Sequence, residues 1–256
     1  MSSTFSLLSA FKGLQKKMDA VSNNLANVNT PGFKRDTVVF KEYYNKLVGQ
    51  DLESAEEHIV QSEFQTPYSR GSSSFAIVDH ISPMMHKGDF KATNNPNDLA
   101  LQTDGFFVVD SSQGLRYTRN GQFLRDGQGY LTTTIGDRVL GKTGAIKITG
   151  QDFIVESDGR ILVDNAEIDQ FKVVIFEQPF RLTKLGNSYW VPGSNTQKPI
   201  DNDNFVVQQG SIESSNVDSV LETVEMITVN RSYEAVQKAM HAKGGLDEKS
   251  ISIAKI

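Results

Sequence analysis

The stretch SNNLANVNTPGFK, residues 22–34, ends a long amphipathic pattern with four asparagines, a Pro-Gly pair and a phenylalanine. Asparagine is a mediocre helix former because its side chain competes for backbone hydrogen bonds. Pro31 disfavours the helical conformation at Thr30, and Gly32 readily adopts a positive φ. The stretch therefore predicts a helix that stops abruptly, followed by a tight turn centred on Pro31 and Gly32.

The residues before this ending repeat apolar side chains in alternating steps of four and three. The repeated positions are Leu7, Phe11, Leu14, Met18, Val21, Leu25 and Val28. This spacing is typical of a coiled-coil seam rather than of a broad core-facing stripe. The sequence thus predicts an N-terminal coiled-coil helix and turn over residues 1–33.

A second helical pattern lies near the other end, at about residues 216–243 within a C-terminal segment of residues 210–256. Ser215 and Asp218 fit a capping box ahead of it, and Gly244-Gly245 predicts its stop. Its apolar residues form two seams. The first contains Val217, Val220, Val224 and Ile227, and the second contains Met226, Val229, Tyr233, Val236 and Met240. The C-terminal helix thus has two apolar seams, whereas the N-terminal helix has only one to pack against them. An isolated monomer would therefore leave apolar surface exposed, which usually marks a protein–protein contact.

Between the helices the sequence changes to short segments rich in β-branched and aromatic residues. Over residues 75–209, segments such as FFVVD, AIKIT and FKVVIFE are separated by Asp-Gly and similar turn signals, and no helical pattern interrupts them. Residues 34–74 predict an extended or irregular linker. The predicted fold class is mainly β with long terminal α-helices, which pair as a coiled-coil-like bundle, and an all-β middle domain.

Composition narrows the function classes. The chain has 256 residues, a net charge of -5 and no cysteine, which excludes disulfides, thiolate zinc sites and cysteine nucleophiles. The negative charge gives no global attraction to nucleic acid. No segment approaches the roughly 20 apolar residues of a membrane-spanning helix, so no membrane insertion is expected. The N-terminus lacks the apolar run of a secretory signal peptide, which predicts a cytoplasmic protein or export without a cleaved signal.

One motif matches a catalytic pattern. Gly136, Gly141, Lys142 and Thr143 in GDRVLGKT satisfy the spacing of a phosphate-binding loop, which works at the start of a helix. The continuation GAIKITG reads as a strand, which favours a β-turn over a nucleotide site. The four histidines lack the helical spacing of a zinc protease. We therefore predict no enzyme activity, no cofactor and no metal site.

Three segments carry a resemblance to a known family. SNNLANVNTPGFKR resembles the signature of the flagellar basal-body rod and hook proteins. NPNDLALQTDGFFVVD is similar to the β domain of that family, and GSIESSNVDSVLETVEMITVNRSYEAVQKAM to its C-terminal motif. The resemblance runs from Ser2 to about Met240 and is weaker between residues 40 and 75. VLGKTGAIKI resembles the proximal rod type, with the distal rod type as the alternative.

The resemblance implies a structural subunit that polymerises helically into the hollow periplasmic drive shaft and transmits motor torque to the hook. Its implied partners are other rod subunits, including itself and neighbouring rod or hook-side proteins, and the flagellar type III export apparatus. The terminal helices would face neighbouring subunits. The predicted assembly interface comprises Leu7, Phe11, Leu14, Met18, Val21, Asn23, Asn24, Leu25, Asn27, Val28, Asn29, Pro31, Gly32, Phe33, Val217, Val220, Leu221, Val224, Ile227, Val229, Tyr233, Val236 and Met240.

Two other interpretations stay open on the sequence. The first is a monomeric β-rich binding module whose terminal helices fold back as an intramolecular hairpin, since seams of this length also occur in ordinary helical bundles. The second is a nucleotide-binding enzyme that uses GDRVLGKT. Continued assembly at high concentration would count against the first, and a turn without a following helix at Lys142 would count against the second.

Overall fold

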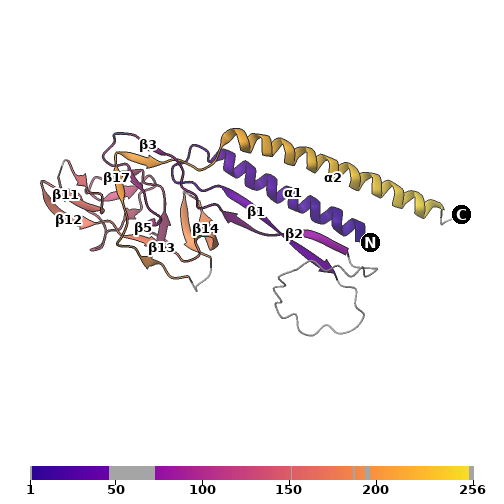
Figure 1. Cartoon of the computed structure of the whole chain (residues 1–256), viewed down its shortest axis with the longest axis horizontal. Helices are drawn as coiled ribbons and strands as arrows, with labels where there is room; N and C mark the ends of the chain where they lie inside the picture. Colours follow the sequence, from indigo (N-terminus) through magenta and orange to yellow (C-terminus); the bar gives the residue numbers. More distant parts are fainter. Residues whose placement is uncertain (1, 46–72, 151, 187, 194–196, 254–256) are drawn as a thin grey trace, which may run out of the picture. The chain divides into compact units, whose positions relative to one another are not determined.

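The computed structural model describes residues 2–45, 73–150, 152–186, 188–193 and 197–253. Within these residues the chain forms two long helices and a series of short strands (Figure 1). The predicted class, mainly β with a helix near each end, is confirmed. The chain divides into two units. The terminal unit comprises Met1–Asp19, Val38–Ile81 and Ile227–Ile256, and the β unit comprises Ala20–Thr37 and Ser82–Met226.

The helices are α1 (Ser2–Ala26), α2 (Ser219–Ile253) and a short 3-10 helix, η1 (Pro179–Arg181). The strands are β1 (Asp36–Asn45), β2 (Ser73–Pro83), β3 (Phe90–Ala92), β4 (Leu99–Leu101), β5 (Phe106–Ser111), β6 (Gly114–Thr118), β7 (Phe123–Arg125), β8 (Leu131–Thr133), β9 (Arg138–Val139), β10 (Ile154–Val155), β11 (Arg160–Val163), β12 (Ala166–Gln170), β13 (Val173–Ile175), β14 (Leu182–Leu185), β15 (Tyr189–Pro192), β16 (Ile200–Asp201), β17 (Val207–Gln209) and β18 (Ser211–Glu213).

The terminal unit combines parts of both helices with a two-stranded sheet of β1 and β2. The ring centroids of Phe11 on α1 and Tyr233 on α2 lie 4.7 Å apart, so the two helices touch at this point. A Cβ added at Gly13 would lie 2.9 Å from Cε1 of Phe40, so α1 packs closely on β1 there. The predicted linker thus begins with a regular strand, and its residues 46–72 lie outside the described residues.

The start of α2 differs from the predicted capping box. The N-cap is Asp218, whose Oδ1 accepts two backbone N–H groups of the first turn at 2.8 and 3.1 Å. Ser215 does not cap the helix, because its Oγ accepts the backbone N–H two residues later at 3.3 Å. The physical reason is Asn216, whose Nδ2 donates to the carbonyls of Met84 and His86, each at 2.9 Å. These bonds hold the chain out of the helical conformation until Asp218.

The predicted end of α2 was also wrong. Gly244 and Gly245 lie inside the helix, which continues to Ile253 instead of stopping near residue 243. A glycine in a helix interior costs only about 1 kcal/mol relative to alanine, and it still donates and accepts its backbone hydrogen bonds. Helix-forming residues on both sides of the pair therefore continue the helix through it.

The β unit is built around a nine-stranded sheet with the order β14-β15-β6-β5-β9-β8-β7, to which β13 and β16 attach. Strand β5 lies between two groups of buried side chains. Phe107 and Val109 belong to the larger core cluster, whereas Phe106 and Val108 belong to the smaller one. This alternation follows from the two-residue period of a strand, and it explains why the segment reads as a continuous apolar run. The β unit thus has an apolar core of its own.

After the short strand β9, the segment LGKTGAIKIT is a loop with isolated bridges, so the regular strand predicted at AIKIT was wrong. Its Ile146 and Ile148 are nevertheless buried in the larger core cluster. Lys142 Nζ pairs with Asp203 Oδ1 at 2.5 Å, and no helix follows it. The local structure is therefore the turn that the sequence favoured over a phosphate-binding loop.

Candidate assembly interface

The turn after α1 has the predicted form. Phe33 N donates to the carbonyl of Thr30 at 3.2 Å, which closes a four-residue turn with Pro31 and Gly32 in the middle. Gly32 has a φ of 68° and donates its N–H to the carbonyl of Glu213 at 2.8 Å. A Cβ at this position would lie 2.5 Å from backbone atoms of residues 119 and 120. Only glycine therefore fits this turn without moving the backbone.

The asparagines before the turn bind within their own chain. Asn24 is fully buried, and its side chain exchanges two hydrogen bonds with the backbone of Asp36, at 2.9 and 2.8 Å. Asn27 Nδ2 donates to the carbonyl of Asn23, in the last turn of α1, at 2.8 Å, and this carbonyl also accepts the Asn27 backbone N–H at 3.2 Å. Since Asn24 has no exposed surface, it cannot bridge to a neighbouring subunit.

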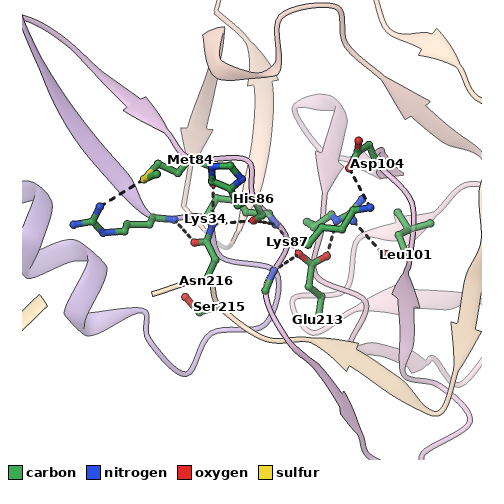
Figure 2. Close-up of polar contacts among 12 residues, drawn as sticks. Lys34, Met84, His86, Lys87, Leu101, Asp104, Glu213, Ser215 and Asn216 are labelled. Atoms are coloured by element: carbon green, nitrogen blue, oxygen red, sulfur yellow. Dashed lines mark hydrogen bonds and ion pairs between the residues drawn. The ribbon is translucent and has the colours of Figure 1, made fainter. Parts of the chain in front are cut away.

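A buried ion cluster joins the segment after the turn to β18. The Glu213 carboxylate accepts a hydrogen bond from Lys34 Nζ at 2.5 Å through one oxygen, and Figure 2 shows both residues. Its other oxygen accepts a hydrogen bond from Arg119 Nε at 2.6 Å. The exposed fractions of the Lys34, Glu213 and Arg119 side chains are 3%, 1% and 4%. Arg119 also donates to the carbonyls of Gly105 and Leu101, at 2.5 and 2.9 Å. Every one of these charges therefore has a direct partner away from water.

The charges of the cluster shift two pKa values. Burial alone would raise the pKa of Glu213, but the neighbouring Arg119 and Lys34 charges hold it below its ordinary value. Burial lowers the pKa of Lys34, against the opposing effect of the Glu213 carboxylate. Glu213 is therefore ionised at neutral pH, and its charge is what compensates the two buried cations.

A second set of contacts ties the same segment to the start of α2. Arg35 Nε donates to Glu222 Oε1, and Glu222 is almost fully buried in the first turn of α2. Arg35 N donates to Asn216 Oδ1 at 2.7 Å. Lys184 Nζ pairs with Asp36 Oδ1 at 2.7 Å. We call the whole set the clasp, and it consists of Asn24, Lys34, Arg35, Asp36, Arg119, Lys184, Glu213, Asn216 and Glu222.

Acidification should destabilise the β unit through Glu213. A carboxyl group whose folded pKa is lowered contributes stability above its unfolded pKa and loses it as the pH falls through the folded value. Because the ordinary value is 4.5, the loss should begin below that pH and grow with further acidification. Denaturant unfolding at a series of pH values measures it. The Glu213→Gln variant should lose less stability between neutral and acidic pH, and equal losses in both proteins would contradict the assignment.

The first turns of α2 carry an exposed apolar surface. Val220, Leu221 and Val224 are 69%, 66% and 57% exposed, and we call these three residues the α2 patch. Ile227 in the next turn is also exposed, whereas Val229 of the second predicted seam is buried. Within the described residues, Val220, Val224 and Ile227 of the first seam are therefore exposed, as the surplus of apolar surface predicted, whereas Val217 of that seam is buried.

The predicted interface residues differ in how accessible they are. Those buried within the chain are Val21, Asn24, Gly32, Phe33, Val217 and Val229. Those half-buried are Leu7, Phe11, Leu14, Met18, Leu25, Asn27, Val28, Pro31, Tyr233, Val236 and Met240. Those exposed are Asn23, Asn29, Val220, Leu221, Val224 and Ile227. The buried group shapes the chain itself, and a contact with a neighbour has to use the exposed and half-buried groups.

Sequence reasoning missed the charged members of the clasp. Lys34, Arg119, Glu213 and Glu222 are scattered along the chain and carry no spacing that indicates a pair. Within the described residues no group of three or more histidine or acidic side chains could hold a metal ion. In the same part of the chain, neither long helix has the apolar length needed to cross a membrane.

Three family models match separate parts of the chain. Residues 6–34 match a model described as flagella basal body rod protein, and residues 100–179 match the flagellar hook protein FlgE/F/G D1 domain. Residues 208–253 match the flagellar basal body rod FlgEFG protein C-terminal model. The first and third models cover the segments that contribute most of the clasp.

Curated relatives match nearly the whole chain. The chain is 32% identical over 250 residues to the flagellar basal-body rod protein FlgG of Bacillus subtilis, with 92% of each chain covered. It is 27% identical to the rod protein FlgF of Mesorhizobium japonicum, with 97% and 96% covered. It is 28% identical to FlgF of Caulobacter vibrioides, with 93% and 91% covered.

Proposed function

The chain belongs to the flagellar basal-body rod protein family, and we propose that it assembles with other subunits through its terminal segments. As a member of this family it is a structural subunit of the basal-body rod and is located there. The comparisons include both FlgG and FlgF relatives. The segment VLGKTGAIKI favours the proximal rod type (FlgF) in our proposal, and the distal type (FlgG) remains the alternative. This role requires no catalysis.

The observation that carries the assembly proposal is the α2 patch. Three large aliphatic side chains in two turns of one helix face water, although burying each would contribute about 1.5–3 kcal/mol. A helical polymer needs a heterologous interface that does not close on itself, and an apolar surface near one end of the chain can supply one side of it. The half-buried residues of α1 and of the second α2 seam would supply the rest, in a coiled-coil-like pairing supported by the Phe11–Tyr233 contact.

The finer parts of the proposal concern the assembled rod. The polymer would be the hollow periplasmic shaft that transmits motor torque to the hook, with the terminal helices toward the axis, where long helices stiffen it. The neighbouring partners would be other rod subunits and hook-side proteins. The chain would reach the growing tip through the flagellar type III export apparatus. The absence of cysteine supports this route, because no disulfide would obstruct passage as an unfolded chain.

The double substitution Leu221→Ser with Val224→Ser tests the patch. Both side chains are mostly exposed in the monomer, so the free energy of unfolding should change by no more than about 0.5 kcal/mol per site. Assembly should require at least a tenfold higher protein concentration, because the lost apolar burial exceeds about 1.4 kcal/mol. Light scattering against concentration measures assembly, and thermal unfolding measures stability.

The matched control replaces equally exposed apolar residues of the β unit. Leu124 and Ile154 are 50% and 60% exposed, and the pair Leu124→Ser with Ile154→Ser should leave assembly unchanged. If the control weakened assembly as much as the patch variant, general surface hydrophobicity rather than the α2 patch would drive it. Unchanged assembly of the patch variant would contradict the proposal directly.

A further inference from the structure

The β unit contains a pocket of about 300 Å³ beside the ion cluster. Its walls are apolar, and they are formed by Met85, Phe106, Ile175, Phe176 and Pro179. Lys34 and Arg119 also line it, together with Gly105 and Asp104. The pocket is at the small end of the size range of ligand sites, about 300–1,000 Å³, and would hold a few side chains rather than a large cofactor.

The charge beside this pocket is unbalanced. Two buried cations, Lys34 and Arg119, share the single buried carboxylate of Glu213. The other carboxylate at the pocket, Asp104, is 88% exposed and pairs with Lys87 at 3.4 Å, and its charge acts on Lys34 less than that of Glu213 does. The buried groups therefore carry an excess of one positive charge. Glu213 pairs with both cations, but its single negative charge does not balance two positive ones, so a carboxylate that entered the pocket would be attracted.

The surface of α2 offers a group of matching chemistry. Asp218 is exposed and precedes the α2 patch, so that one acidic and three aliphatic side chains lie within two helical turns. Its Oδ1 caps the helix, but a carboxylate has about four acceptor positions and retains capacity for a further cation. The start of α2 is thus acidic and apolar, and the pocket is cationic and apolar.

We propose that the start of α2 in one copy docks into this pocket of a second copy. Leu221 and its neighbours would contact the apolar walls, and the Asp218 carboxylate would approach Lys34 and Arg119. Patch and pocket are different surfaces of the same chain, so the contact is heterologous and can repeat from copy to copy, as a rod requires. The inference rests on the proposed function and adds the surface that receives the patch.

Disulfide cross-linking of single-cysteine variants tests the docking. The chain has no cysteine of its own, so no other thiol can form a disulfide. One variant carries Leu221→Cys in the patch, and the other carries Ile175→Cys in the half-buried pocket wall. Mixed under oxidising conditions, they should form a disulfide-linked dimer with both substitutions at a yield at least tenfold above that of the control mixture. The control mixture combines Ile175→Cys with Ile154→Cys, whose site is similarly exposed.

A second variant tests the proposed contact of the Asp218 carboxylate with Lys34 and Arg119. Asp218→Asn removes the negative charge but keeps a good N-cap residue, so α2 should start unchanged. In the Leu221→Cys background it should lower the dimer yield several-fold, whereas the charge control Asp203→Asn in the same background should leave the yield unchanged. Added salt should lower the yield of the parent mixture more than the yield of the mixture that carries Asp218→Asn. Equal yields with and without Asp218→Asn would overturn the proposed contact with Lys34 and Arg119.

Wild-type sedimentation at the same concentration separates the two proposals. If the wild-type chain assembles but the Leu221→Cys and Ile175→Cys mixture gives no more dimer than the control, the docking is wrong and the proposed function stands. If the wild-type chain stays monomeric, the proposed assembly fails and the docking fails with it. Binding of laurate to the monomer without selective dimer formation would identify the pocket as a fatty-acid site and overturn the docking.

Discussion

Replacing Glu213 by glutamine should lower the free energy of unfolding by about 3–5 kcal/mol. The carboxylate lies between Lys34 and Arg119, at 2.5 and 2.6 Å, and all three side chains are buried. Glutamine keeps the size and part of the hydrogen bonding but removes the only buried negative charge of the cluster. Two cations would then face each other away from water. Chemical denaturation at neutral pH measures the loss.

An exposed ion pair of the same length provides the control. Lys142 and Asp203 are also 2.5 Å apart, but their side chains are 47% and 75% exposed. Asp203→Asn should cost no more than about 1 kcal/mol, because water screens the pair. Similar losses in the two variants would mean that the buried cluster is no more important than a surface pair, and the clasp would lose its energetic basis.

Replacing Gly32 by alanine should cost about 3 kcal/mol or more, near the upper range for single substitutions. Gly32 has a positive φ, and an added Cβ would lie 2.5 Å from the backbone at Arg119. The backbone must therefore shift at one side of the turn. Such a shift would also displace Lys34 and Arg119, whose contacts with Glu213 depend on position.

Gly244→Ala is the matched control for this substitution. Gly244 lies in α2, and no atom lies within 4 Å of a Cβ added there. Alanine should therefore stabilise the helix by about 0.5–1 kcal/mol, since glycine is the weaker helix former. Thermal unfolding of both variants gives the comparison. A Gly32→Ala protein as stable as the wild type would show that the turn does not pack as described.

The local features of the chain could be predicted from sequence. The α1 pattern and the turn at Pro31 and Gly32 depend on residues within a few positions of each other, and the structure contains both. The sequence of β5 also indicates a strand buried on both faces, because its first four residues are all apolar. Strand β12, which pairs with β11 in a separate three-stranded sheet, was missed, although Asp164 and Asn165 in the preceding turn both have positive φ, which Asp and Asn tolerate.

The clasp could not be predicted, because its contacts are far apart in sequence. Lys34 and Glu213 are separated by 179 residues, and Asn24 and Glu222 by 198. No periodicity links such positions, and a charged residue read in isolation is expected on the surface. The same limit explains the wrong start of α2, since Asn216 is held by carbonyl groups at residues 84 and 86.

These long-range contacts change the meaning of the asparagine-rich segment. The sequence suggested that its asparagines face other subunits, whereas Asn24 binds Asp36 within the chain. The segment that follows it binds β18 and the start of α2 through Lys34 and Arg35. The N-terminal signature therefore shapes the subunit itself, and the α2 patch is the surface we propose for contact between subunits.

Sedimentation velocity of the full-length chain over a range of concentrations tests the central claim most directly. Open-ended assembly through the terminal segments predicts that the sedimentation coefficient keeps rising with concentration, while the variant with Leu221→Ser and Val224→Ser stays monomeric at the same concentrations. A wild-type chain that remains a monomer, or that stops at one fixed oligomer, would contradict assembly into a rod through these surfaces.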